Sequence, residues 1–263
     1  MKTSKLAKNV IVDDAIKRME SKLKATQLPT KEALALACKI LFAFGHDSGL
    51  SGQISARGEQ PGTYWTQALG LGFDEAAPEN LLLIDEDLNV LEGDGMANPA
   101  NRFHSWLYRA RPDVKCIVHS HSLYASALSM LEVPLNISHM DPCSLYGQVA
   151  FLEKWPGIPV GNDEGEIIST ALGDKKAILL AHHGILIAGA NIEEACVLGV
   201  MIERAARLQI LAMSAGEIKP VNPKLGEEAQ KWINTPRRQQ ATFAYYARRA
   251  EKLLRASNSV QEA

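Results

Sequence analysis

The sequence predicts a single layered α/β domain flanked by helices. Short apolar runs with the length of buried strands, such as residues 114–118 and 177–181, alternate with longer stretches whose apolar side chains recur at helical spacing. No linker-like tract, internal repeat or low-complexity segment divides the chain, and 263 residues suffice for one domain with a full hydrophobic core. We therefore expect strands and helices to pack as layers around one core.

Two helices are predicted at the N-terminal end. The first covers about residues 12–25, and its apolar face carries Ile16, Met19 and Leu23. The second begins with Thr30 as its N-cap, because a threonine hydroxyl can accept a hydrogen bond from the first turn, and it stops at Gly45. We expect residues 1–28 to form a helical extension and residues 29–263 to form the main domain with its C-terminal helices.

The middle of the chain mixes turns, strands and a helix. A Gly-rich turn at residues 49–55 precedes strand-like pieces that run up to residues 81–85. A helix from about Arg102 is expected to stop at Arg111, because the residue before a proline resists the α conformation. Residues 134–162 show no clear period and are predicted to be irregular.

Further helices are marked by their capping residues. Ser122 is the predicted N-cap of a short helix. Asn191 and Glu194 have the spacing of a capping box and are expected to start a long helix that ends near Gly216. Pro236 separates that region from a final helix.

Charge and hydropathy point to neither nucleic acid nor membrane as a partner. The formal net charge is -2, and no apolar run approaches the ~20 residues that a membrane span needs. The C-terminal region is locally basic, through Arg237, Arg238, Arg248, Arg249, Lys252 and Arg255. Their helical spacing is typical of a solvated or subunit-facing stripe.

A cytoplasmic location is expected. Residues 1–5 are not followed by the apolar stretch of a signal peptide. The four cysteines form no CxxC motif and lie mostly inside apolar runs, which is typical of small core residues in a reducing compartment. They are Cys38, Cys116, Cys143 and Cys196.

Histidines follow two of the predicted strands. His119 and His121 end the first run, and residues two apart on a strand point to the same face. A third histidine comes from the pair His182-His183, which follows the second run. Three neutral imidazoles with an open position suit Zn²⁺ and similar ions. The spacing alone also fits ordinary edge histidines, with a core histidine beside an exposed one.

Four motifs taken together resemble the class II aldolase/adducin family. They are GLSGQIS at residues 49–55, Phe103-His104 ahead of RPD at 111–113, VHSH at 118–121 and HHG at 182–184. The resemblance runs from about Thr30 to Met213, with a weaker match around Tyr246. It implies a three-layer α/β/α fold with a central antiparallel-rich sheet, usually assembled as a homotetramer. The family contains sugar-phosphate aldolases, an epimerase, a dehydratase and aromatic decarboxylases, whereas adducin heads use the fold without known chemistry.

The resemblance also implies a ligand set. His119, His121 and His183 would hold a divalent metal, foremost Zn²⁺, with Mn²⁺, Mg²⁺ or Fe²⁺ as alternatives, and His182 would be a neighbour. A metal chelated by a carbonyl and an adjacent hydroxyl stabilises an enediolate, which lowers the barrier to C–C cleavage or proton abstraction.

The chain departs from the sugar-phosphate enzymes at two places. Their acid lies four residues before the histidine that corresponds to His104, and here that position is Ala100. Where they hold phosphate with hydroxyl side chains, this sequence has Asn98, Pro99 and Leu69. Only the backbone amides of the Gly-rich turn remain as an anion cradle. An unphosphorylated substrate is therefore expected.

Other residues are candidates for substrate binding and proton transfer. By resemblance, Asp141 falls near the catalytic acid of related epimerases, and Tyr246 falls where family members present a tyrosine across a subunit boundary. A turn aspartate and a packed helix tyrosine are the simpler alternatives. His139 is a further proton-transfer candidate. The substrate-binding candidates are Gly52, Gln53, Ser55 and His104.

These observations favour a metal-dependent lyase that acts on a small, unphosphorylated hydroxy-carbonyl or carboxylate substrate. Aldol cleavage and decarboxylation through a metal-stabilised enolate both remain open, although decarboxylation needs no base to start C–C cleavage and so fits the missing acid. The alternative is a non-catalytic, adducin-like binding or scaffold protein. Retention of all three histidines argues against it, because a scaffold does not need the ligand set.

Overall fold

The computed structural model describes residues 7–24, 27–158 and 160–261, and its centre is one eight-stranded sheet. The strand order is β4-β3-β2-β1-β5-β8-β7-β6, and in the described residues every neighbouring pair is antiparallel except β6 and β7. The antiparallel-rich sheet predicted above is therefore confirmed. The strands are β1 (Gln53–Arg57), β2 (Thr63–Gln67), β3 (Leu81–Asp85), β4 (Val90–Glu92), β5 (Cys116–Ser120), β6 (Val149–Leu152), β7 (Ala177–Leu180) and β8 (Ile185–Gly189).

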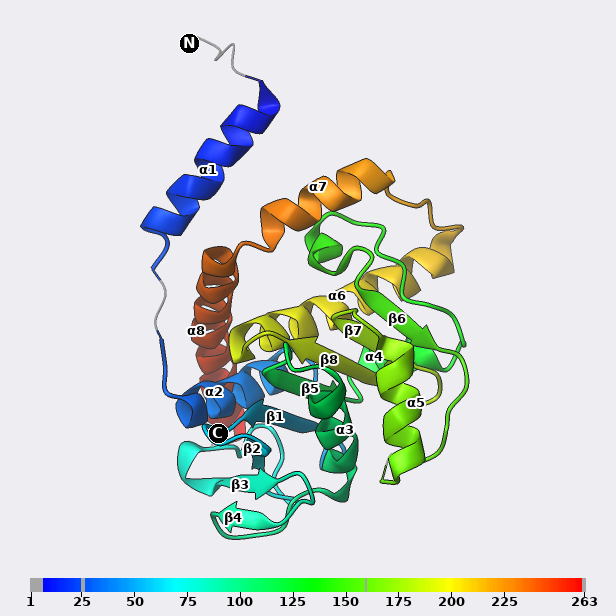
Figure 1. Cartoon of the computed structure of the whole chain (residues 1–263). Coiled ribbons are helices and arrows are strands. Elements are labelled where there is room, and N and C mark those ends of the chain that lie inside the picture. Colours follow the sequence, from blue (N-terminus) through cyan, green and yellow to red (C-terminus); the bar gives the residue numbers. More distant parts are fainter. Residues whose placement is uncertain (1–6, 25–26, 159, 262–263) are drawn as a thin grey trace.

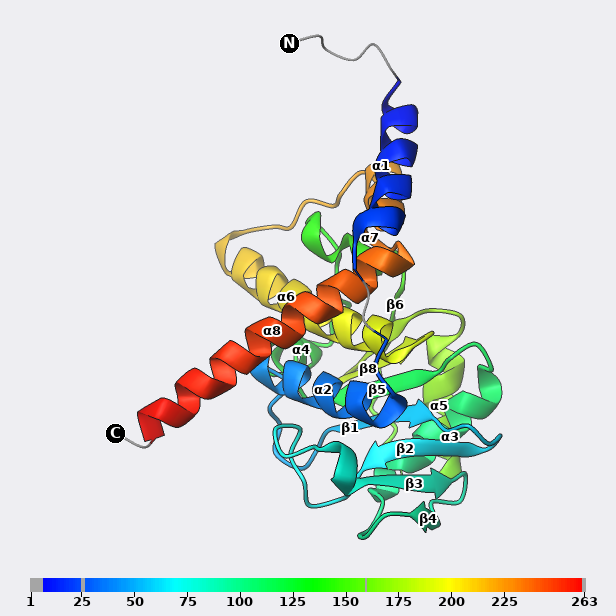
Figure 2. The ribbon, with the colours of Figure 1, turned by 90° about the vertical axis from the view of Figure 1, so that its left-hand side faces the viewer.

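Helices cover both faces of this sheet, as Figures 1 and 2 show from two sides. Helices α3 and α5 lie on one face, and α2, α6 and α8 lie on the other, so the predicted three-layer architecture is confirmed. The helices are α1 (Lys8–Lys22), α2 (Thr30–Ala43), α3 (Arg102–Ala110), α4 (Leu123–Ser129), α5 (Asn162–Leu172), α6 (Ile192–Ala215), α7 (Pro223–Ile233) and α8 (Pro236–Gln261). Short 3-10 turns are η1 (Pro78–Asn80), η2 (Pro99–Asn101) and η3 (Asp141–Leu145).

The two faces of the sheet bury two hydrophobic clusters. Along β5, Cys116 and Val118 pack in the cluster under α2, α6 and α8, whereas Ile117 packs in the cluster under α3 and α5. Side chains of a strand alternate between faces, so a strand covered on both sides reads as a continuous apolar run. This explains why β5 and β7 are recognisable in the sequence. All four cysteines are buried and unpaired, as expected of core residues.

Helix α1 stands off the main body and has no buried residue (Figure 1). It begins earlier and ends earlier than predicted. Its contacts are with the C-terminal helices, where Lys8 pairs with Glu228 and the backbone amide of Arg237 donates to Glu20. None of the described helices is long and apolar enough to cross a membrane.

Of two predicted N-caps, Thr30 is wrong and Ser122 is right in position but makes no cap hydrogen bond. Thr30 is the first residue of α2, and Pro29 occupies the cap position without a side-chain hydrogen bond. Ser122 does precede α4, but its hydroxyl makes no cap hydrogen bond. Instead the carboxylate of Glu203, from α6, accepts hydrogen bonds from the backbone amides of Tyr124 (2.9 Å) and Ala125 (3.0 Å). A long-range carboxylate therefore satisfies the first turn of α4.

Other boundaries agree or need correction. The cap of α6 is confirmed, since Asn191 Oδ1 accepts from the amide of Glu194 at 2.8 Å. Strand β6 lies inside residues 134–162, so the prediction of an irregular stretch is wrong there. Its four residues are too few to show a clear pattern of hydrophobic side chains. Its parallel partner β7 lies 25 residues or more further along the chain, so no hairpin signal marks β6 either. Strand β1 begins at Gln53, so the Gly-rich turn is shorter than predicted.

Candidate metal centre

Three histidines point toward one another where β5 and β7 end. Nε2 of His119 lies 3.1 Å from Nε2 of His121, and one ligand nitrogen from each of these and from His183 lie within 4.8 Å of one another. Two nitrogens each about 2.05 Å from a tetrahedral zinc ion would be ~3.3 Å apart. The donor set therefore fits a single divalent ion. No carboxylate or thiol of the described residues joins this group.

Strand β5 sets the directions of the first two histidines. His119 faces the α3 layer, where its ring lies 5.1 Å from that of Phe103. Ser120 comes next and faces the opposite layer, where its Oγ lies 2.7 Å from Nδ1 of the buried His46. His121 follows the strand and lies again beside His119. Because side chains alternate along the strand, the two imidazoles face one layer while the hydroxyl of Ser120, between them in sequence, contacts His46 in the other layer.

The turn between β7 and β8 separates the two adjacent histidines. His182 has a left-handed backbone, with φ of 56°, and its Nε2 lies 2.7 Å from a carboxylate oxygen of Glu132 at the surface. The amide of His183 donates to the carbonyl of Leu180 at 3.1 Å, which closes the turn and directs its ring inward. His182 therefore lies outside the histidine cluster, as expected of a neighbour.

Gly184 allows this turn to approach β5. A Cβ at this position would lie 2.5 Å from the carbonyl oxygen of Ser120 and 2.8 Å from Cδ2 of His121. Any side chain would push the turn away from the strand. The glycine thus determines how closely His183 can approach the other two histidines.

The cluster is held in the neutral form that metals require. Nδ1 of His119 lies 2.8 Å from the carbonyl of Ile185, and since a carbonyl only accepts, Nδ1 carries the proton and Nε2 is free. Burial lowers the pKa of His119 well below its ordinary value and also lowers the pKa of His121. Burial, with His121 nearby, lowers the pKa of His183 to about 4. All three imidazoles are therefore neutral at pH 7.

Two predicted substrate-binding residues are tied to each other. Oγ of Ser55 lies 2.7 Å from Nδ1 of His104 and 2.9 Å from the hydroxyl of Tyr108, and none of the three is exposed. Nε2 of His104 has no partner, and burial lowers the pKa of this histidine to about 3. Protein contacts therefore occupy Ser55, and Nε2 of His104 is the free atom of the pair. One turn earlier, Ala100 offers no acid.

The other two predicted substrate-binding residues, Gly52 and Gln53, lie where the Gly-rich turn meets β1. Gln53 pairs with His119 across β1 and β5, and its buried Oε1 has no partner. A Cβ at Gly52 would lie 2.9 Å from the ring of Phe73. The amides of residues 53–55 lie within the strand, and that of Ile54 donates to the side chain of Gln67. The prediction that backbone amides of residues 49–55 form an anion-binding site is therefore wrong for residues 53–55.

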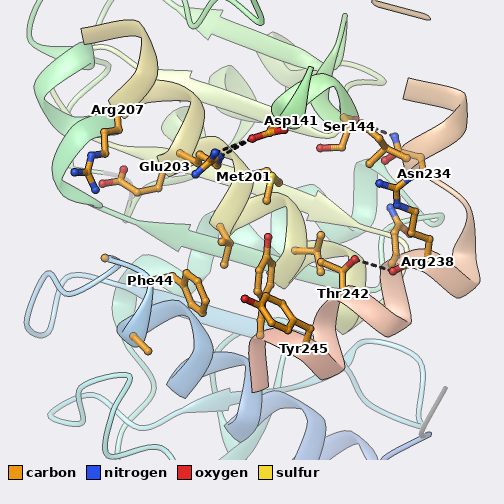
Figure 3. A pocket seen from close by; sticks show the side chains of 18 of the residues that line it. Phe44, Asp141, Ser144, Met201, Glu203, Arg207, Asn234, Arg238, Thr242 and Tyr245 are labelled. Atoms are coloured by element: carbon orange, nitrogen blue, oxygen red, sulfur yellow. Dashed lines mark hydrogen bonds and ion pairs between the residues drawn. The ribbon is translucent and has the colours of Figure 1, made fainter. Parts of the chain in front are cut away.

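The predicted catalytic residues Asp141 and Tyr246 lie in a separate pocket of about 810 Å³ between η3, α6 and α8 (Figure 3). None of the three clustered histidines lines it. Tyr246 is buried against Phe44, with ring centroids 4.8 Å apart, and burial raises the pKa of its phenol to about 12. Both Nε and Nη2 of Arg204 donate to Oδ2 of Asp141, at 3.2 and 2.7 Å.

His139 lies two residues before Asp141 and is exposed. Its Nδ1 accepts a hydrogen bond from the backbone amide of Asp141 at 3.2 Å. The same Nδ1 lies 3.9 Å from the carboxylate of Asp141. The structure thus places His139 beside the pocket and away from the histidine cluster.

Sequence reasoning missed the polar side chains of this pocket. Arg238, predicted above to belong to a solvated or subunit-facing stripe, is half-buried and lines this cavity. Ser144 and Asn234 also line it. The usable signal was the spacing of Arg238, Thr242 and Tyr246, which lie four apart on one face of α8.

Comparison with known proteins shows where this architecture occurs. Residues 32–210 match the family model described as the class II aldolase and adducin N-terminal domain. The chain is 31% identical to decarboxylase NovR of Streptomyces niveus, over 72% of this chain and 71% of that protein. It is 29% identical to the meiotically up-regulated gene 14 protein of Schizosaccharomyces pombe, over 81% of this chain and 86% of that protein.

Among solved structures, the chain is similar to L-fuculose 1-phosphate aldolase from Glaciozyma antarctica PI12. The TM-score is 0.77 at 29% sequence identity, and the match covers 96% of this chain and 94% of that chain. The proteins similar to this chain thus include one named as an aldolase and one named as a decarboxylase.

Proposed function

Because the chain belongs to the class II aldolase and adducin family, we propose that it is a metal-dependent lyase that cleaves a C–C bond in a small, unphosphorylated hydroxy-carbonyl or carboxylate substrate. The convergence of His119, His121 and His183 is the observation that carries this proposal. An adducin-like scaffold would gain nothing from three buried or half-buried neutral imidazoles held at ligand distances.

These histidines would hold the ion, and Zn²⁺ suits three neutral imidazoles best. When bound, such an ion supplies a Lewis acid that polarises a substrate oxygen. The chain supplies the fixed geometry: the Ile185 carbonyl fixes the tautomer of His119, and Gly184 lets His183 approach. Nε2 of His104, which has no partner, is a nitrogen beside His119 that can take part in a hydrogen bond with a substrate.

Decarboxylation is the reaction we favour within this class. No carboxylate of the described residues joins the histidine cluster, and Ala100 occupies the position of the family's acid. Loss of carbon dioxide leaves its electron pair on the substrate without prior removal of a proton, so only a later proton donor is needed. The phenol of Tyr246 is protonated at neutral pH and can serve as that donor.

Asp141 and Tyr246 would reach the metal of another subunit. Within one chain they line a pocket that none of the clustered histidines shares. A closed homotetramer would bring this pocket against the histidine cluster of a neighbour and make every site equivalent. In this arrangement Tyr246 and Asp141 transfer or hold protons, and His139 lies at the rim.

A substrate screen on the purified protein tests the reaction. The panel contains unphosphorylated hydroxy-keto acids and aromatic carboxylates, together with fuculose and rhamnulose phosphates, and carbon dioxide release is followed beside carbonyl products. We expect the best turnover outside the sugar phosphates. Efficient cleavage of a sugar phosphate would contradict the importance given to Ala100, Asn98 and Leu69. A protein that binds metal but turns over nothing would favour the scaffold alternative.

A further inference from the structure

The pocket that contains Asp141 and Tyr246 has a polar end. Ser144, Asn234 and Arg238 lie together there (Figure 3). The hydroxyl of Ser144 is buried and has no hydrogen-bond partner, and the side-chain oxygen of Asn234 is also unpaired. The amide nitrogen of Asn234 donates to the backbone carbonyl of Ser144 at 2.9 Å, which fixes the amide. Unpaired buried polar atoms of this kind are rare, and they point to an absent partner.

Arg238 provides the charge at this end. Among the described residues, the guanidinium donates one hydrogen bond, from Nη1 to the backbone carbonyl of Trp232 at 3.2 Å, and lies 5.6 Å from the centroid of the Trp232 ring. No carboxylate of the described residues pairs with it. Burial lowers the pKa of its guanidinium, because a buried site disfavours the charged form. The edge formed by Nε and Nη2 is free, and such an edge can donate two parallel hydrogen bonds to one carboxylate.

Aromatic rings form the other wall. Phe44 and Tyr245 lie across the cavity from the polar end (Figure 3). The ring of Tyr246 contacts both, with its centroid 4.8 Å from that of Phe44 and 5.7 Å from that of Tyr245. Tyr124 also lines the cavity. Rings at these spacings offer faces and edges on which another aromatic ring can stack. The remaining wall is aliphatic and contains Val197, Val200 and Met201.

The charges of the lining set the charge of the ligand. Three arginines and two acids line the pocket, so one positive charge is in excess. Arg204 is neutralised by Asp141, and the carboxylate of Glu203 is bound to the first turn of α4. The exposed Arg207 lies over the ring of Tyr124, 5.3 Å from its centroid. Arg238 is therefore the guanidinium beside the unpaired polar atoms, and the net excess of one positive charge matches a monoanion. A phosphate dianion normally receives more positive charge than this pocket offers.

We propose that this pocket binds an aromatic monocarboxylate, with its carboxylate on Arg238 and its ring against Phe44, Tyr245 and Tyr246. The hydroxyl of Ser144 and the side-chain oxygen of Asn234 receive a further polar group of the same molecule. This names the substrate class of the lyase, and in that respect it rests on the proposed function, because only the shared site brings the bound acid to a metal. The binding itself does not depend on the metal.

Titration calorimetry with the full-length protein tests the binding, both as purified and after dialysis against EDTA. Phenylpyruvate is the probe. Phenylacetone replaces its carboxylate by a methyl group, pyruvate lacks the ring, and phenyl phosphate carries the dianion. We expect phenylpyruvate to bind in both preparations and to bind at least about 10-fold more tightly than each of the three others.

Variants locate the site. Arg238→Gln should weaken phenylpyruvate binding about 10- to 100-fold, and Arg238→Lys should recover only part of it, since a lysine lacks the two-pronged edge. Ser144→Ala should weaken binding by a smaller factor. The matched control is Arg249→Gln, an exposed arginine on the same helix, which should bind as the wild type does. The comparison of the four compounds uses only the wild-type protein, so it tests the proposal even if a variant fails to fold.

The outcomes separate the two proposals. Equal affinity for phenylpyruvate and phenylacetone, or unchanged binding in Arg238→Gln, overturns the pocket assignment whatever the metal does. Tighter binding of phenyl phosphate overturns the choice of a monoanion. If phenylpyruvate binds through Arg238 but aromatic acids are not turned over, the pocket is a binding site for aromatic carboxylates, and the proposal that such acids are the substrates of the lyase is wrong.

Discussion

The histidine cluster and the α6–α8 pocket are built in opposite ways. The cluster comes from the ends of two neighbouring strands, and backbone geometry fixes it: alternation along β5 for His119 and His121, and a glycine turn for His183. The pocket gathers side chains from six elements between Phe44 and Tyr246. The three histidines meet within one chain, while the pocket leaves the Ser144 hydroxyl without a hydrogen-bond partner and the Arg238 guanidinium without a carboxylate among the described residues. This difference supports the proposal that the pocket receives a ligand or part of a neighbouring subunit.

The largest effect on metal binding and turnover is expected from replacing the three histidines that are proposed to bind the metal. His119→Ala, His121→Ala and His183→Ala should each lower metal affinity by more than the roughly 10- to 100-fold typical of an outer-shell change, and should abolish turnover. His182→Ala should retain about one ion per subunit, because His182 faces Glu132. Elemental analysis of the purified variants checks this. Metal retained in all three of the first variants would contradict the site.

A large effect on stability is expected from pH. Burial lowers the pKa of His46 to about 4, whereas an unfolded histidine titrates near 6.5. The unfolded state therefore takes up a proton in the window between these values while the folded state does not. The contribution of His46 to the free energy of unfolding should be fully present above pH 6.5 and fall by up to about 3 kcal/mol as the pH drops toward 4, and the other buried histidines add losses of the same sign.

Urea unfolding of the metal-depleted protein at several pH values measures this slope. The His46→Gln variant keeps a polar side chain beside Ser120 but cannot titrate, so its slope should be shallower. An identical slope in the variant would show that His46 is not responsible for the loss.

A smaller effect is expected at Gly184. Gly184→Ala places a Cβ against the Ser120 carbonyl and should cost about 1–3 kcal/mol of stability, because the turn must move. The same movement should lower metal affinity. Gly147→Ala is the control, since its backbone is left-handed but no atom lies within 4 Å of the added Cβ. It should cost about 1 kcal/mol and leave metal affinity unchanged. Equal metal affinity in both variants would contradict the role given to Gly184.

The smallest effects concern the first turn of α4, which joins the two regions. Glu203→Ala should destabilise the protein by about 0.5–2 kcal/mol, as loss of a cap does. Ser122→Ala should change stability by less than about 0.5 kcal/mol, because its hydroxyl caps nothing. Thermal unfolding of the two variants compares them directly, and a larger loss in Ser122→Ala would reverse the assignment.

The histidine cluster could be predicted from the sequence, whereas the α6–α8 pocket could not. The motifs around His119, His121 and His183 are local, so their spacing and their resemblance to a family indicate one ligand set from the residues alone. The capping role of Glu203 and the strand β6 depend on partners far along the chain, and no local pattern marks them. Nor does a local pattern mark Arg238 as a pocket residue, since its place depends on residues from several elements that meet there.

Subunit mixing tests the central claim, that the histidines of one chain and Tyr246 of another form one site. Tyr246→Phe and His183→Ala subunits are prepared separately, each with low activity, and are then allowed to exchange. Random mixing of equal amounts pairs an intact cluster with an intact tyrosine at about a quarter of the sites, so about a quarter of the wild-type activity should return. Mixed oligomers that form but regain no activity would show that the two regions do not share a site.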